Sequence, residues 1–277
     1  MRPLLVVDGD SFAHRAYHAL PKSMRRENGR PGNALVGFTD MLLRLVRAEC
    51  PRTVLVAWDT LDVPTYRHTA LEAYQSGRVF DDELLEQLDQ LPAVVRSMGF
   101  ATAKEPGYEA DDFLAAAATA EEEAGGTALV ATSDRDAFQL VTDRVTVLQP
   151  APGGVPKRVG PDEVRARYGV DPAQVTDFIA LRGDPSDKIP GARGIGEKRA
   201  AELLAQYASL ADMLEEGRFA SEADALRLYR RIATMDRTAP LPPLPDVTPD
   251  WAGAAAHLRE LGLEQVARRV EEAREWT

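Results

Sequence analysis

Short, fully apolar runs that end near an acidic residue are the feature of this 277-residue chain that most restricts its fold. Such runs suit strands that are buried on both faces, because parallel strands covered by helices are apolar at nearly every position. The runs are Leu4–Val7 before Asp8, Val54–Trp58 before Asp59, and Ala128–Ala131 before Ser133 and Asp134. They predict buried parallel strands.

Between these runs, apolar residues recur at spacings of three and four, which is typical of helices with one buried face. The expected helices are Ala34–Ala48, Asp82–Met98 and Asp111–Ala124. Strands that alternate with helices predict an α/β fold with a mostly parallel central sheet. Ligands of such sheets bind beyond the carboxyl ends of the strands, so we expect Asp8 and Asp134 to face one crevice.

After Pro156 the pattern becomes helical, and we therefore divide the chain into an α/β region, residues 1–160, and a helical region, residues 161–277. A proline-rich connection, Ala239–Pro249, precedes the last helix. The expected helices of this region are Pro161–Tyr168, Pro172–Leu181, Gly196–Leu210 and an amphipathic helix from Trp251 towards Glu275.

The net charge is −11, from 33 Lys and Arg against 44 Asp and Glu, which argues against a protein coated in positive charge for binding phosphates. A local basic strip can still bind a nucleic-acid backbone while acids elsewhere hold metal ions. The only cysteine, Cys50, predicts a buried structural thiol and a reducing, cytoplasmic compartment. No run is long enough for a signal peptide or a membrane span.

Four groups of acidic residues are the main candidates for chemistry. They are Asp8 with Asp10, Glu109 with Asp111 and Asp112, Asp134 with Asp136, and Asp184 with Asp187. Each group alone also suits a turn or a helix cap. Together they predict one cluster, because Glu109 and Asp112 share a helix face at i, i+3 and Asp134 follows a strand.

Converging carboxylates need cations, because two of them about 4 Å apart repel by about 4 kcal/mol at an effective dielectric constant near 20. Hard oxygen ligands select Mg²⁺ or Mn²⁺, and four His and one Cys are too few to favour zinc. Two such ions can activate a water and stabilise the leaving oxygen in phosphodiester hydrolysis.

A glycine-rich run, GDPSDKIPGARGIGEKR, extends from Gly183 to Arg199, and we call this segment the glycine hairpin. Its glycines permit a tight turn whose backbone amides can approach phosphate closely. An ordinary packing corner between two helices also fits such a pattern, but its place just after Asp187 favours a phosphate grip coupled to the acids. The expected contact residues are Gly191, Arg193, Gly194, Gly196, Lys198 and Arg199.

Four motifs in this order resemble the bacterial 5′ nuclease family, which occurs as free flap endonucleases and as the amino-terminal domain of DNA polymerase I. They are VVDGDSFAHRAYHAL at Val6–Leu20, YEADD at Tyr108–Asp112, TSDRDAFQL at Thr132–Leu140 and DFIALRGDPSDKIPGARGIGEK at Asp177–Lys198. The resemblance implies a PIN-like nuclease core with a helical arch over about residues 66–98. It also implies a helix-three-turn-helix over about residues 177–210 that holds duplex DNA, often with a bound potassium ion.

The same resemblance implies roles for individual residues. Asp10 is not among the family's ligands. The implied metal ligands are Asp8, Glu109, Asp111, Asp112, Asp134, Asp136, Asp184 and Asp187. Arg15 is similar to a phosphate-steering residue, and Tyr74 is similar to an aromatic residue that stacks on a base near the cut.

Two positions depart from the family pattern. Gln75 stands where the family usually has a lysine that contacts the scissile phosphate, so weaker transition-state stabilisation is expected unless Arg78 or Arg15 substitutes for it. Lys188 stands where asparagine is usual, and contact with DNA and screening of the acids both remain open as its role.

The expected function is a structure-specific 5′-3′ exonuclease and 5′-flap endonuclease that hydrolyses DNA with two divalent ions. We expect a monomer that acts on 5′ flaps, nicks, free 5′ ends and RNA primers. Since the sequence ends at Thr277, we also expect it to work without an attached polymerase.

Three alternatives remain. Gln75 is compatible with an impaired relative that binds branched DNA without cutting it efficiently. Asp8, Asp10 and the GDPSDK segment imitate haloacid-dehalogenase-like phosphohydrolases, in which Asp8 is a nucleophile, but that interpretation leaves the TSDRD run and the glycine hairpin unexplained. A ribonuclease of the related PIN-type fold would usually lack the long arch and the hairpin.

Overall fold

The computed structural model describes residues 2–61, 63–77, 80–151 and 153–276, and its centre is a six-stranded sheet of order β3-β2-β1-β4-β5-β6. All neighbouring strands are parallel except β5 and β6. The strands are β1 (Leu4–Asp8), β2 (Thr53–Ala57), β3 (Ala101–Ala103), β4 (Ala128–Ala131), β5 (Val145–Gln149) and β6 (Lys157–Val159). The prediction of an α/β fold with a mostly parallel sheet is confirmed.

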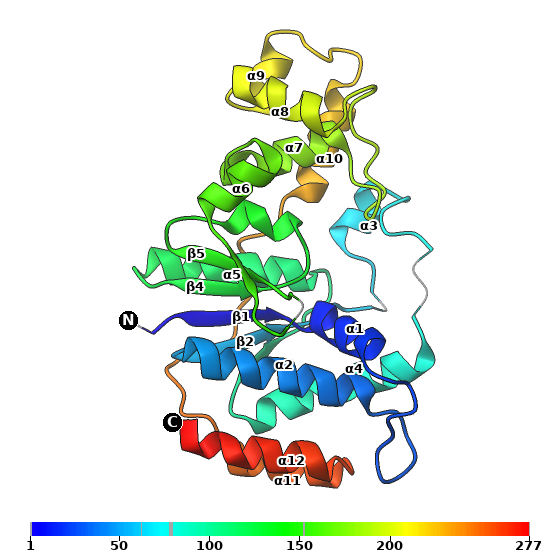
Figure 1. Ribbon diagram of the computed structural model, residues 1–277. Helices are drawn as coiled ribbons and strands as arrows, with labels where there is room; N and C mark the ends of the chain where they lie inside the picture. Colours follow the sequence, from blue (N-terminus) through cyan, green and yellow to red (C-terminus); the bar gives the residue numbers. More distant parts are fainter. Residues whose placement is uncertain (1, 62, 78–79, 152, 277) are drawn as a thin grey trace.

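Helices cover both faces of the sheet (Figure 1). Alternate residues of β1 enter two different cores, Leu4 and Val6 on one face and Leu5 and Val7 on the other, and all four are buried. The second face is covered by α1 (Gly9–Ala19), α2 (Asn33–Glu49), α4 (Asp82–Ser97), α11 (Trp251–Glu260) and α12 (Glu264–Glu272). Two-sided burial explains why the strand is apolar at every position before Asp8.

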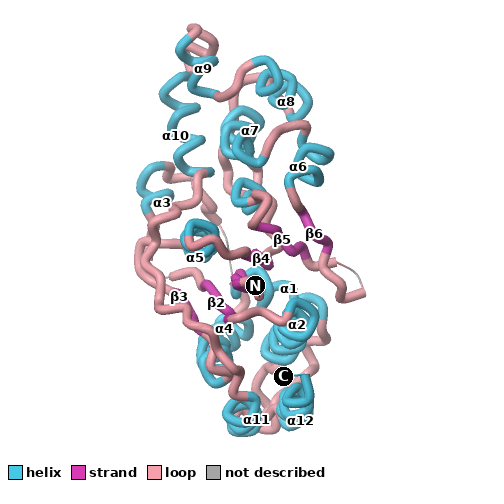
Figure 2. The backbone as a smooth tube through the Cα atoms, turned by 90° about the vertical axis from the view of Figure 1, so that its left-hand side faces the viewer, coloured by secondary structure: helices cyan, strands magenta, loops and turns pink. Residues whose placement is uncertain are grey.

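The other face carries α5 (Ala110–Glu123), the short 3₁₀ helix η1 (Asp136–Leu140) and a stack of further helices (Figures 1 and 2). That stack comprises α6 (Pro161–Tyr168), η2 (Pro172–Gln174), α7 (Val175–Arg182), α8 (Glu197–Gln206), α9 (Leu210–Glu215) and α10 (Ala223–Ala233). The chain then returns along the sheet to α11, α12 and η3 (Ala273–Trp276) at the opposite end. No helix within the described ranges is long and apolar enough to cross a membrane.

Two predicted helices were wrong in extent. The helix expected over Gly196–Leu210 ends at Gln206. The last helix, expected to run from Trp251 towards Glu275, is interrupted by Gly262, whose φ of +74° is the left-handed conformation that ends helices. The interruption lets α11 and α12 pack against each other as a pair.

The stretch of about residues 66–98, in which the helical arch was predicted, contains two helices, α3 and α4. Helix α3 (Tyr66–Ala70) has five residues. Helix α4 belongs to the core, where Leu84 and Leu91 are buried against the layer that contains α2 and α11. Described residues of the connecting segment and of α4 both border the site, among them Gln75 and Leu84, and Arg78 lies outside the described residues.

The expectation that Cys50 is a buried thiol was wrong, because the structure places it at the surface. It is the residue at which α2 ends, with a left-handed φ of 45°, and its backbone N–H donates to the carbonyl of Val46. A helix end just before Pro51 leaves the side chain outside the core.

Candidate active site

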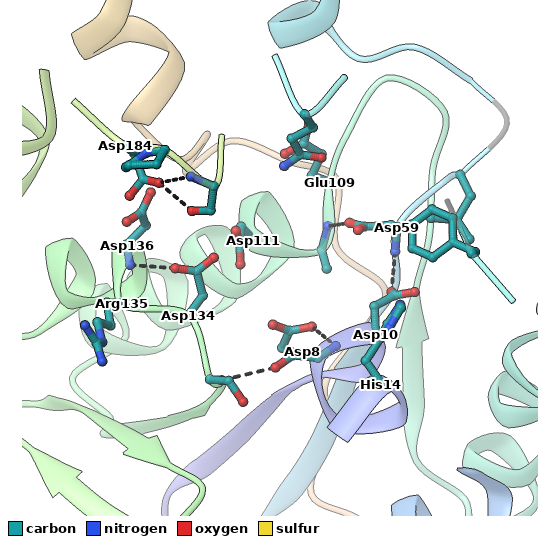
Figure 3. Close-up of a pocket in the computed structure, with 18 of the residues that line it drawn as sticks. Asp8, Asp10, His14, Asp59, Glu109, Asp111, Asp134, Arg135, Asp136 and Asp184 are labelled. Carbon is teal, nitrogen blue, oxygen red and sulfur yellow. Dashed lines mark hydrogen bonds between the residues drawn. The ribbon is translucent and has the colours of Figure 1, made fainter. Parts of the chain in front are cut away.

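A cavity of 1110 Å³ lies at the carboxyl ends of β1, β2 and β4 (Figure 3). Among the described residues that line it, two arginines, Arg135 and Arg182, oppose ten carboxylates. The carboxylates are Asp8, Asp10, Asp59, Asp81, Glu109, Asp111, Asp134, Asp136, Asp184 and Glu197. The crevice predicted for this edge of the sheet is therefore strongly negative.

Asp8 ends β1 and caps α1. Its Oδ1 accepts the backbone N–H of Ser11 at 2.9 Å, and its Oδ2 accepts the hydroxyl of Thr132 at 2.7 Å. Burial raises the pKa of Asp8 to about 7, the two hydrogen bonds oppose that rise, and the charges of Asp59 and Asp134 add to it. The carboxylate is thus held in one orientation, at a cost in free energy when it is ionised.

Asp134 links the acids of β1 and α5 to those of the glycine hairpin. Its backbone N–H donates to the hydroxyl of Thr132 at 3.0 Å, and its Oδ1 accepts the N–H of Asp136 at 2.8 Å. After burial, the charge of Asp134 is the leading cause that raises the pKa of Asp111 and of Asp136. Asp134 therefore lies between two groups of acids, as Figure 3 shows.

Asp184 is the acid of the glycine hairpin that lines the cavity. Its Oδ1 accepts the N–H of Ser186 at 2.7 Å, and its Oδ2 accepts Nη2 of Arg182 at 3.1 Å. Asp187 is held beside the cavity by Gln75, whose Nε2 donates to its Oδ1 at 3.1 Å. The charges of Asp187 and Asp184 both raise the pKa of Asp136, so the hairpin acids belong to the same electrostatic cluster.

Asp59 is a candidate ligand that was missed in the prediction of the site. It follows β2, lines the cavity, and accepts the backbone N–H of Ala110 at 2.7 Å through Oδ1. Its own N–H donates to Oδ2 of Asp10 at 2.7 Å, which makes Asp10 a support for the Asp59 backbone. The signal was available, because Asp59 follows an apolar run just as Asp8 does.

Asp112 was predicted as a metal ligand, and in this structure its carboxylate is paired with the guanidinium of Arg67. Its side chain is fully buried and accepts two hydrogen bonds from Arg67, at 2.9 and 2.6 Å. It also accepts the backbone N–H groups of Glu109 and Asp236. Glu109 is the N-cap of α5 and Asp112 is its N3 residue, so the two acids do lie close together, and Arg67 contacts both carboxylates.

Tyr74 was predicted to stack on a base, but its side chain is only 3% exposed. Its hydroxyl donates to Oε2 of Glu109 at 3.0 Å and accepts Nε2 of Gln75 at 2.9 Å. Glu109 also accepts the hydroxyl of Thr65 at 2.7 Å. In this structure Tyr74 orients a cavity carboxylate, and no face of its ring is open to a base.

Arg15 is the last predicted residue of the chemical step that lies within the described part of the chain. Arg15 is exposed on α1 and is not part of the cavity lining. Lys188, of the hairpin, donates from Nζ to the carbonyl of Ser76 and, at 2.9 Å, to its hydroxyl. The two departures from the family pattern, Gln75 and Lys188, thus lie where the hairpin meets the segment between α3 and α4.

The hairpin between α7 and α8 exposes most of the residues predicted to bind phosphate. Gly191 is half-buried; the exposed residues are Arg193, Gly194, Gly196, Lys198 and Arg199. The first turn of α8 adds backbone N–H groups that face outwards after Gly196.

Gly191 and Gly194 form a matched pair for testing the hairpin, because both have left-handed φ values, +76° and +73°. A Cβ on Gly191 would lie 2.5 Å from the backbone N of Gly183, whereas one on Gly194 would meet nothing within 4 Å. We expect Gly191→Ala to lower the free energy of unfolding by about 2 kcal/mol or more, and Gly194→Ala by about 1 kcal/mol. Urea denaturation measures both, and equal losses would contradict this geometry.

Metal ions fit this cavity by its chemistry. Within the described part of the chain, no three His, Cys, Asp or Glu side chains are already arranged to ligate one ion. The donors are nevertheless hard carboxylate oxygens, and burial and mutual repulsion raise the pKa values of Asp8, Asp10, Asp111 and Asp136. Divalent cations that prefer oxygen would neutralise this charge.

The raised pKa values predict how stability changes with pH. Between about pH 4 and pH 7 the folded protein binds more protons than the unfolded chain at these acids, so their contribution to stability falls as pH rises. The shift of the Asp8 pKa to about 7 corresponds to a loss on the order of 4 kcal/mol. We expect melting temperatures in EDTA to fall more steeply with pH for the wild type than for Asp8→Asn. Added Mg²⁺ should stabilise the wild type at pH 7.5. Parallel curves of melting temperature against pH for the two proteins would contradict the raised pKa of Asp8.

Models of one family match most of the chain. The model for the 5′-3′ exonuclease N-terminal resolvase-like domain matches residues 3–169, and that for the 5′-3′ exonuclease C-terminal SAM fold matches residues 170–250. DNA polymerase I of Mycobacterium tuberculosis is 40% identical over 255 residues, which cover 88% of this chain and 28% of the relative. The thermostable DNA polymerase I of Thermus thermophilus is 40% identical over 213 residues, 76% of this chain and 25% of the relative. The chain spans about a quarter of the length of these relatives.

Solved structures share the fold at low sequence identity. The T5 5′-exonuclease with bound zinc has a TM-score of 0.71 at 18% identity, covering 98% of this chain and 99% of that one. The catalytic core of Rad2 in complex with DNA substrate has a TM-score of 0.61 at 14% identity, covering 98% of this chain and 90% of that one. These likenesses show a common fold for nearly the whole chain.

Proposed function

Because this chain belongs to the 5′-3′ exonuclease family, we propose that it is a 5′-3′ exonuclease and 5′-flap endonuclease that hydrolyses DNA phosphodiesters with two divalent ions, Mg²⁺ or Mn²⁺. The observation that carries the proposal is the cavity in which ten carboxylates face two arginines. A surface that only bound DNA would gain nothing from negative charge that repels phosphates. A site that holds cations at a phosphodiester requires such charge.

The metal-holding residues that we propose are seven acids that line the cavity, Asp59 among them, and Asp187 beside it. They are Asp8, Asp59, Glu109, Asp111, Asp134, Asp136, Asp184 and Asp187. When bound, the ions would supply an activated water and stabilise the leaving oxygen. Thr132 orients Asp8 and Asp134 together, and Thr65 with Tyr74 orients Glu109, so these neighbours hold the acids in place before DNA arrives.

Duplex DNA is proposed to dock on the hairpin between α7 and α8. Backbone amides near Gly191 and Gly194, with Arg193, Lys198 and Arg199, offer donors to phosphates, and a potassium ion at the helix-three-turn-helix is part of the proposal. Phosphate contacts position a duplex without reading its bases, so binding should depend on DNA structure and salt. The proposed substrates also include nicks, free 5′ ends and RNA primers. The proposed active species is a monomer.

Lys188 supplies a positive charge close to Gln75, which stands where the family usually has a lysine. Its Nζ bonds to Ser76, next to Gln75, so it is a cation at the border of the cavity. A lysine there can attract a phosphate as it enters. The second candidate function, an impaired relative that binds branched DNA, is favoured by Gln75 itself, whose carboxamide is engaged by Tyr74 and Asp187.

The two candidates are separated by comparing wild type, Lys188→Gln and Gln75→Lys on one 5′-flap duplex. The nuclease proposal predicts cutting near the junction by the wild type and slower cutting by Lys188→Gln. Flap binding by the wild type without cutting in Mg²⁺ or Mn²⁺, with cutting restored in Gln75→Lys, would establish the impaired relative instead.

A further inference from the structure

A second cavity, of 520 Å³, lies between α3 and α10 and has the opposite charge to the first. Figures 1 and 2 both show α10 beside α3, in the helical part of the molecule. Among its described lining residues, Asp236 is the single carboxylate. The arginines of the lining are Arg227, Arg230, Arg231 and Arg237. In a chain of net charge −11, so many guanidinium groups in one hollow mark a site for an anion.

The floor of this arginine cavity is built rigidly. Arg67, 2% exposed, donates from Nε to the carbonyl of Ile232 at 3.0 Å and from Nη2 to the carbonyl of Thr234 at 3.2 Å. Its partner Asp112 accepts the N–H of Asp236 at 2.8 Å. The segment that follows α10 is therefore bonded to a buried ion pair.

Two of its four guanidinium groups, those of Arg231 and Arg237, have no carboxylate partner among the described residues, whereas Arg230 is paired with the buried Asp177. Arg237 donates to the carbonyl of Gln139 at 3.2 Å. Arg227 pairs with Asp224, a fully exposed acid that competes weakly with a phosphate. Arg227 and Arg231 are four residues apart on α10, so their side chains lie on one face.

The lining favours phosphates over bases. The ring of Tyr66 is covered by the guanidinium of Arg67, 4.6 Å from its centroid, and its hydroxyl donates to the carbonyl of Thr234 at 3.1 Å. The guanidinium of Arg231 also approaches this ring, at 5.9 Å from its centroid, so the ring contacts arginines rather than offering an open face to a base. The cavity volume is in the range that whole organic ligands fill, so it exceeds the needs of one phosphate group.

The arginine cavity adjoins the carboxylate cavity through Arg67. Nη1 of Arg67 lies 3.4 Å from Oε2 of Glu109, which lines the first cavity, while Nη2 contacts Thr234, which lines the second. We propose that the arginine cavity binds consecutive phosphates of a single nucleic-acid strand, the one that continues past the carboxylate site. The identity of that strand rests on the proposed function, whereas the phosphate site itself does not.

The test is the affinity of the protein for a fluorescent single-stranded oligodeoxynucleotide, measured by anisotropy in Ca²⁺ over a range of salt concentrations. The double variant Arg227→Gln/Arg231→Gln is expected to bind about tenfold more weakly. The slope of log K against log salt should become shallower by about 1.4, as expected when two single-strand phosphate contacts are lost. The matched control is Arg268→Gln, an exposed arginine of α12 at the other end of the molecule, which should leave both values unchanged.

An affinity and a salt slope that are unchanged in the double variant would overturn the proposal. So would a double variant that loses binding of inorganic tripolyphosphate but binds the oligonucleotide normally, because the site would then take free anions. If the wild type cuts flaps while the double variant binds single strands normally, only this inference fails. If single strands bind through these arginines and no flap is cut, the phosphate site stands and the proposed nuclease fails.

Discussion

Asp134→Asn is expected to lower the rate of flap cleavage by at least roughly 100-fold, more than is typical for groups that only support a metal ligand. Asp134 lies between two groups of acids, since its charge raises the pKa of Asp8, Asp111 and Asp136 alike. Replacing Asp134 should therefore weaken metal binding by both groups of acids. Asparagine keeps the oxygen that accepts the N–H of Asp136, so the fold should be retained.

The measurement is single-turnover cleavage of a labelled 5′-flap duplex, with flap affinity determined separately in Ca²⁺. Affinity should change little, and the melting temperature in EDTA should rise because one repelling charge is removed. Asp143→Asn removes an exposed carboxylate outside the cavity and should cut like the wild type. Full cleavage by Asp134→Asn at moderate Mg²⁺ would exclude this residue from the metal site.

Arg67→Met is expected to lower the free energy of unfolding by about 3–5 kcal/mol, the largest stability effect that we predict. The variant leaves Asp112 buried, charged and without its guanidinium partner. It also removes hydrogen bonds to the carbonyls of Ile232 and Thr234, which join α3 to the end of α10.

Urea denaturation of three variants separates the effect of the buried charge on the free energy of unfolding from the effect of lost packing. The double variant Arg67→Met/Asp112→Asn should recover part of the loss, because the uncompensated charge is gone. Arg269→Met breaks a two-point pair with Asp40 at a half-exposed site and should cost clearly less. A double variant as unstable as Arg67→Met would show that the buried charge does not determine the loss.

The central strands could be predicted because burial on both faces makes their sequences distinctive. The run Leu4–Val7 and the strand β1 differ by a single residue, and Ala128–Ala131 coincides with β4. The outer strands carry little local signal: β3 is three residues of Ala-Thr-Ala, and β6 begins with two exposed cations. Their pairing depends on neighbours that are distant in sequence.

The acids at strand ends could be predicted on the same basis, and Asp59, which follows β2 and lines the cavity, obeys the same rule. Asp112 and Tyr74 could not be placed in this way. The orientation of Asp112 is determined by Arg67, 45 residues away in sequence, and that of Tyr74 by Glu109, 35 residues away. Neither pairing follows from periodicity, because each forms only when α3 packs against α5 and α10.

The central claim is that the carboxylate cavity cuts DNA with the help of divalent ions. The most direct test is incubation of the wild-type chain with an end-labelled 5′-flap duplex across a titration of Mg²⁺ and of Mn²⁺, beside an EDTA sample. We expect a product cut near the flap junction that increases with metal concentration and is absent in EDTA. An intact flap at every metal concentration, under conditions where the duplex is bound, would contradict it.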